Sequence, residues 1–147
     1  MIVDETNLNI IRQLRDGRKS FREIARELSI TENTVRSRVR KLIEEGIFSI
    51  SGLVEPSSIH NHVLAFVGVK LKTMNLVKKG EEISRLKGVV SVAVVTGRYD
   101  LIVILMLNEG FGLLEFYTKE MSKVSEVLSV ETFVAYDSFN LKVPYIL

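Results

Sequence analysis

The sequence predicts an α+β protein of two domains, with three short helices in the first and a βαββαβ order of elements in the second. Two observations predict this class. The stretch Phe21–Ile43 has the apolar spacing of two helices with a short break between them. After residue 62, strand-type and helix-type segments alternate. A chain of 147 residues can hold one medium domain or two small ones.

Three helices are predicted in residues 1–50. The first covers about Asp4–Arg15, and Phe21–Ile43 supplies the other two. Ser29–Ile30 makes the break, Thr31 can cap the third helix, and Gly46 stops it. The residues that set the helical spacing are Leu8, Ile11, Leu14, Ile24, Leu28, Val35, Val39 and Leu42. The pattern is a helix-turn-helix of the winged type, whose second helix enters the major groove of double-stranded DNA.

Residues 51–62 are predicted to link the two domains as a strand-like hinge. Ile47–Val54 has an extended pattern, and Pro56 followed by two serines marks a turn. The predicted organisation is therefore a DNA-binding domain at 1–50, a linker at 51–62, and a second domain at 63–147.

The second domain is predicted to be ferredoxin-like, with a four-stranded antiparallel sheet and helices on one face. Pro144 is expected to stop its last strand. The predicted elements are, in order, strand Val63–Lys72, helix Asn75–Leu86, strands Val89–Thr96 and Leu101–Leu107, helix Phe111–Val124 and strand region Val130–Val143.

The composition excludes several classes of protein. The longest apolar runs are far shorter than the roughly 20 residues that span a bilayer. The absence of cysteine excludes disulfides and cysteine-ligated zinc, and His60-x-His62 alone cannot complete a metal site. We therefore expect a cytoplasmic protein without a metal or cofactor. The net charge is only +2, but residues 31–43 hold four basic residues against Glu32 alone.

The third helix supplies the candidate DNA-binding residues. Val35, Val39, Leu42 and Ile43 define its buried side, so the opposite side is free to meet a duplex. Residue chemistry predicts contacts with bases from Asn33, Thr34, Arg36 and Ser37. It predicts phosphate contacts from Arg38, Arg40 and Lys41. Alternatively, Arg38 pairs with an acidic residue such as Asp4 within the fold.

The apolar run Leu101–Leu107 predicts a homodimer. A sheet with helices on one face should alternate apolar and polar residues, and this run does not alternate. Leaving a few such side chains in water would forgo several kcal/mol, at about 25 cal/mol per Å2. We expect the open face to pack on the sheet of a second copy. In the alternative, the linker or the helical part covers this face within one chain.

The whole arrangement resembles the Lrp/AsnC family, the leucine- and asparagine-responsive transcription regulators. The residues that carry the resemblance are Asp4, Ile10-Ile11, Ile24-Ala25, Thr34-Val35, Arg38-Val39, Leu42, Gly46-Ile47 and the turn Thr96–Asp100. Two positions depart from the family pattern. Ser29 stands in the helix break where glycine is common, and Asn61 stands in Ile59–His62, where it can take the left-handed backbone that glycine would.

The resemblance implies a RAM/ACT-like second domain, dimers with paired sheets, further assembly into octamers, and a small effector bound between dimers, usually an amino acid. It places the effector at the turn formed by Gly97, Arg98, Tyr99 and Asp100. Residues Thr132, Tyr136 and Ser138 of a neighbouring subunit would complete the site.

The chemistry of the turn suits an amino acid. Gly97 offers backbone N–H groups for a carboxylate, Asp100 can accept from an α-amino group, and Tyr99 can line a pocket. The turn could equally be a plain hairpin connection. Two other functions remain open: an enzyme resembling sirohaem decarboxylases of the same architecture, and an effector-free architectural DNA-binding protein.

Overall fold

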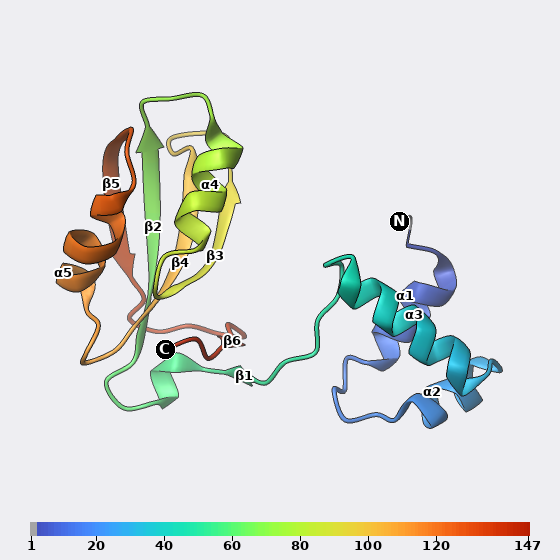
Figure 1. Cartoon of the computed structure of the whole chain (residues 1–147). Helices are drawn as coiled ribbons and strands as arrows, with labels where there is room; N and C mark the ends of the chain where they lie inside the picture. Colours follow the sequence, from blue (N-terminus) through green and yellow to red (C-terminus); the bar gives the residue numbers. More distant parts are fainter. Residues whose placement is uncertain (1–2) are drawn as a thin grey trace. The chain divides into compact units, whose positions relative to one another are not determined.

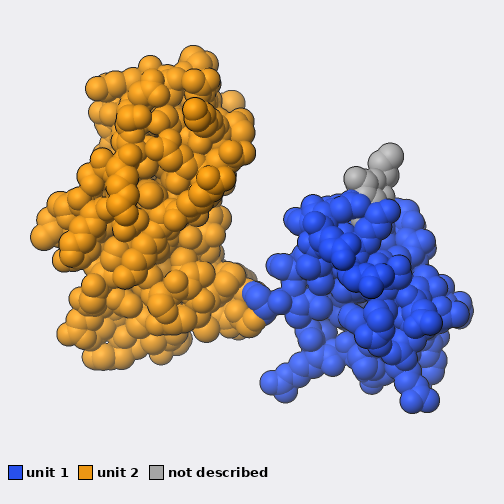
Figure 2. Space-filling model, viewed as in Figure 1, with its two compact units in different colours: residues 1–51 blue, residues 52–147 orange. Residues whose placement is uncertain are grey.

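The computed structural model describes residues 3–147, which divide into two compact units, Met1–Ser51 and Gly52–Leu147 (Figure 2). The break lies at the start of the segment 51–62 that the sequence marks as a hinge. Each unit has its own apolar core.

Unit 1 is a bundle of three helices, α1 (Glu5–Gln13), α2 (Phe21–Leu28) and α3 (Glu32–Glu44) (Figure 1). Each helix begins at a polar side chain that accepts a backbone N–H of the first turn, namely Asp4, Ser20 and Thr31. Ser20 and Glu23 form a reciprocal capping box. The predicted cap of the third helix is therefore confirmed.

The break between α2 and α3 occurs where the sequence predicts it. Ser29 has φ of 54° and Asn61, in unit 2, has φ of 57°, so both take the left-handed backbone that glycine often provides. The core of unit 1 is formed by Ile10, Leu14, Ile24, Ala25, Val35 and Val39. Ile43 differs from the prediction, because it lies off the inward face of α3 and is 45% exposed.

Unit 2 contains a four-stranded antiparallel sheet in the order β3-β4-β2-β5 (Figure 1). Its strands are β2 (Val63–Leu71), β3 (Val89–Val94), β4 (Leu101–Leu107) and β5 (Val127–Val134). One face packs against α4 (Leu76–Ser84) and against a second helical segment. That segment is α5 (Leu113–Glu115), followed by a π-helical stretch (Phe116–Glu120) and a 3-10 turn (Met121–Lys123). The predicted ferredoxin-like arrangement is confirmed.

The prediction for the end of the chain was wrong in detail. The last strand of the sheet begins at Val127 and ends at Val134, and residues 135–142 leave the sheet. Pro144 does not stop a strand. It belongs to β6 (Val143–Pro144), which pairs with β1 (Leu53–Val54) in a separate two-stranded sheet. Proline fits there because a two-stranded ladder has free edges, which do not need its missing N–H.

The second face of the large sheet is covered at one end. Met106 and Leu64 are buried there with Val143 of β6, and side chains from β1 and the C-terminal segment pack around them. Ile102 and Ile104 lie on the same face and are only half-buried. The linker strand thus covers part of the apolar face, and the middle of that face stays open within one chain.

Candidate nucleic-acid interface and effector turn

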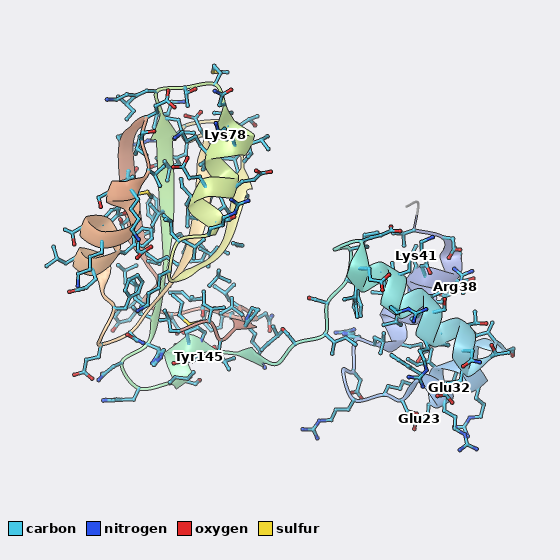
Figure 3. All side chains as sticks on the ribbon, in the orientation of Figure 1. Glu23, Glu32, Arg38, Lys41, Lys78 and Tyr145 are labelled. Carbon is cyan, nitrogen blue, oxygen red and sulfur yellow. The ribbon has the colours of Figure 1, made fainter. Side chains whose placement is uncertain are left out.

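Helix α3 presents a polar face that its own core contacts orient. Val35 and Val39 are buried against α1 and α2, which leaves Asn33, Ser37 and Lys41 exposed on the other side. Among the described residues, nothing pairs with the ammonium group of Lys41 (Figure 3). These side chains can meet base edges or phosphates without breaking a contact of the fold.

Thr34 and Arg36 are already engaged inside unit 1. The Thr34 hydroxyl lies 2.8 Å from that of Thr31, and the Thr34 N–H donates to the same cap at 3.1 Å. Nη2 of Arg36 donates to Oε1 of Glu32 at 2.7 Å. The Arg36 guanidinium carbon also lies 5.4 Å from the centre of the Phe21 ring. Sequence reasoning did not predict this ion pair, although the (i, i+4) spacing of the two charges signals it.

Arg38 is the partner of Asp4 that the sequence offered as an alternative role. Its Nη1 donates to Oδ2 of Asp4 at 2.7 Å and to Oδ1 of Asn7 at 3.0 Å. Oδ1 of Asp4 accepts the backbone N–H of Asn7 at 2.7 Å and so caps α1. The bond from Arg38 is the main cause that lowers the pKa of Asp4, and the N–H of Asn7 adds to it. Arg38 therefore ties α3 to the start of α1.

Arg40 is held only loosely. Its Nε lies 4.0 Å from Oε1 of Glu44, and both side chains are about two-thirds exposed or more. Such a pair contributes little in water, so Arg40 can leave it for a phosphate.

The predicted effector turn connects β3 to β4. Gly97 has φ of +123°, and the space beside its Cα is open. The carboxylate of Asp100 accepts the backbone N–H of Leu71 at 2.8 Å and Nζ of Lys70 at 3.0 Å. The N–H of Leu71, followed by Lys70, holds the pKa of Asp100 below its usual range. Asp100 thereby joins the turn to the end of β2.

Tyr99 and Arg98 fold over the sheet face opposite the helices. A Cβ atom on Gly68 would lie 2.8 Å from the Tyr99 ring, so the ring rests on that glycine. Tyr99 also meets Phe133 edge-on, with ring centres 6.5 Å apart. Arg98 lies 3.5 Å from Glu131 on β5. Glu131 was missed because the strand pairing that brings it near cannot be read from sequence spacing.

The three residues predicted to complete the effector site do not lie together at one place within a single chain. Thr132 faces the helices, where its hydroxyl lies 2.5 Å from that of Tyr117. Tyr136 is fully exposed in the segment after β5, and Ser138 donates its N–H to Asp137. A single site that contains the turn 97–100 and these three residues would therefore need residues from more than one subunit.

Two further absences concern the described residues 3–147. None of their helices is long and apolar enough to cross a membrane. No group of three or more histidine or acidic side chains among them comes together in a way that could hold a metal ion.

Comparison with known proteins agrees with the two units. Residues 3–48 match the family model described as winged helix-turn-helix DNA-binding, and residues 64–142 match the one described as Lrp/AsnC ligand binding domain. The HTH-type transcriptional regulator Ptr1 of Methanocaldococcus jannaschii is 34% identical over 122 residues, which cover 82% of each chain.

Solved structures share the fold. The crystal structure of PH0061 has a TM-score of 0.80 at 23% identity and covers 97% of this chain and 98% of its own. A transcriptional regulator of Neisseria meningitidis, solved as a complex with L-Met, has a TM-score of 0.70 at 17% identity and covers 95% and 94%.

Fold and site together define a two-domain protein that joins a DNA-binding helix-turn-helix to a ligand-binding α+β domain. The chain belongs to the Lrp/AsnC family of transcriptional regulators. This family consists of regulators and not enzymes, so the decarboxylase alternative is set aside.

Proposed function

We propose that the chain binds specific DNA sequences as a homodimer or higher oligomer, and that a small effector, an amino acid, modulates its binding or assembly. The observation that carries the proposal is the outward face of α3, where Asn33, Ser37 and Lys41 are exposed and α3 is anchored by buried Val35 and Val39. A rigid helix with free donors and acceptors on one side suits the major groove.

The residues divide into two roles. Asn33, Arg36 and Ser37 read base edges near the start of α3, and Arg40 and Lys41 hold phosphates toward its end. Arg38 acts through the fold, because its guanidinium is bound to Asp4 and Asn7.

Fluorescence anisotropy with labelled duplexes tests these roles. A selected site should bind far more tightly than random duplex, and affinity for both should fall steeply with salt. Equal affinity for all duplexes would leave only an architectural DNA-binding role. No binding at low salt would refute the proposal.

The effector is proposed at the turn 97–100. The open space beside Gly97 leaves the backbone free for a carboxylate, and the Neisseria regulator of the same fold was solved with L-Met. The bonds of Asp100 to Leu71 and Lys70 favour the rival view, a purely structural turn.

Titration calorimetry with each standard amino acid separates the two views of the turn. Heat with one or a few of them, lost when Gly97 is replaced by valine, supports the effector site. No heat with any would assign the turn to structure alone.

A further inference from the structure

Glu32 is the first residue of α3 (Figure 3), and Arg36 follows it one helical turn later. Its carboxylate accepts from Arg36 at 2.7 Å, and the two side chains remain 43% and 59% exposed. An acidic side chain here is unexpected for a DNA-binding surface, because it repels phosphates. Glu32 is the only acid in residues 31–43, so its place beside Arg36 calls for a chemical reason.

Arg36 is held from a second side by an aromatic ring. Its guanidinium carbon lies 5.4 Å from the centre of the ring of Phe21, which is itself half-buried against the core of unit 1. The ring near the guanidinium and the carboxylate at one of its nitrogens restrict the movement of this group. Arg40 has no comparable support, since its carboxylate partner is 4.0 Å away.

The orientation of an arginine decides what it recognises. Guanine offers two acceptors on one edge, and only an arginine with a correctly placed fork meets both. A freely moving arginine binds any phosphate instead. The bond to Glu32 uses one nitrogen of Arg36, and other N–H donors remain for a base.

We propose that Glu32 is a specificity-determining positioning residue, which holds Arg36 in the plane that reads guanine and lowers the attraction of α3 for phosphates in general. The inference rests on the proposed DNA-binding function. It assigns a role to a residue that itself need not touch the duplex.

The test uses the full-length chain and a pool of random-sequence duplexes. Bound duplexes are selected with the wild type and with Glu32→Gln, and the base preferences are compared. The variant keeps the size of the side chain and removes its charge. We expect preference for guanine at one position of each half-site to fall about 5- to 100-fold. Affinity for random duplex should rise, with a salt slope steeper by up to about 0.9.

Glu44→Gln is the matched control. It removes the same charge from the other (i, i+4) pair of α3, with Arg40, at the opposite end of the helix. It should raise affinity for all duplexes alike and leave base preference unchanged. A cooperative thermal melt of each variant shows that both fold.

A second arm repeats Glu32→Gln in an Arg36→Ala background. There it should no longer change base preference, because the residue that it positions is gone. The inference is overturned if Glu32→Gln keeps the wild-type guanine preference, or if it relaxes that preference equally without Arg36. A wild-type chain that selects no sequence would overturn the proposed function as well.

Discussion

Asp100 shows how one carboxylate can hold a turn in place. Its two oxygens accept from the backbone of Leu71 and from Lys70, and these bonds lower its pKa. A carboxylate whose pKa is lowered by folding stabilises the fold above its unfolded pKa, and loses that contribution as the pH falls through the folded pKa.

Asp100→Asn should therefore melt at a lower temperature than the wild type at neutral pH. The difference should begin to close as the pH falls below the unfolded pKa of about 3.9, and should vanish once the pH is below the lower pKa of the folded carboxylate. Thermal melting by circular dichroism across acidic pH checks this. Asp137→Asn, at an exposed position after β5, is the control and should follow the wild type. A difference that persists unchanged in acid would contradict the linkage.

Position 68 requires a glycine because the ring of Tyr99 lies close to it, and not because of its backbone angles. A Cβ atom there would lie 2.8 Å from three carbons of Tyr99, so the ring would have to move. We expect Gly68→Ala to alter the near-ultraviolet circular dichroism of Tyr99 and to destabilise unit 2 by about 1 kcal/mol.

Gly80→Ala is the matched comparison for that substitution. The nearest atoms to its new methyl group are 3.7 Å away, an ordinary contact, and the residue lies inside α4. It should stabilise by about 0.5–1 kcal/mol. If both alanine variants behave alike, Tyr99 does not rest on Gly68.

Among the helices and strands, α3 carries basic side chains of two kinds: some are bound within the fold, and others are free at the surface. Arg38 belongs to the scaffold, since it joins α3 to Asp4 and buried Asn7 at the start of α1. Lys41, three residues later, projects from the exposed side (Figure 3). Residues three apart lie near one another on a helix surface, so the contacts of Arg38 with α1 are what separate the two roles, and charge by itself does not predict a DNA contact.

Arg38→Ala should lower stability by about 1 kcal/mol, because Asn7 loses a charged partner. Lys41→Ala should leave stability within about 0.5 kcal/mol. The effect on DNA affinity should be larger for Lys41→Ala, which should weaken binding to every sequence and reduce the salt slope by about 0.9. Denaturant melts and anisotropy titrations measure both. Equal stability of the two variants would argue that the link to Asp4 is not formed in solution.

Element boundaries were predictable where local chemistry sets them. Thr31, Ser29 and the apolar spacing of α3 locate that helix from sequence alone. The end of β5 was set too late in the sequence prediction. Residues 135–142 include Asp137, Ser138 and Asn140, which favour turns, and this segment leaves the sheet before β6 pairs with the distant β1.

For the molecule as a whole, the main question is what covers the open face of the large sheet, because apolar side chains remain exposed on it within one chain. Phe133 is 47% exposed on this face, which it shares with half-buried Ile102 and Ile104 two strands away. Apolar side chains gathered on one face mark an interaction surface. A second copy of the same sheet is the occupant that we propose.

Phe133→Glu should convert the dimer into a monomer, because each pairing would bury two like charges without partners. Sedimentation velocity at micromolar concentration measures this. Met74→Glu, at an 87% exposed site between β2 and α4, is the control and should leave assembly unchanged. A wild type that sediments as a monomer would refute the dimer itself.

The α+β class, the three helices with the cap of the third, and the order of strands and helices in the second unit could all be predicted from the sequence. These features depend on periodicity and on capping residues within a few positions of one another, which are local properties. It also singled out α3 and the turn 97–100 as candidate sites.

The partners of these residues became known from the three-dimensional structure. Arg38 reaches Asp4 across 34 positions, Asp100 bonds Leu71 across 29, and Tyr99 rests on Gly68. The sequence offered Asp4 only as one alternative for Arg38 and gave no indication of the other two contacts, because helix packing and strand register create them. The physical reason is that packing brings distant residues within a few ångströms, and hydrogen bonds form only at that range.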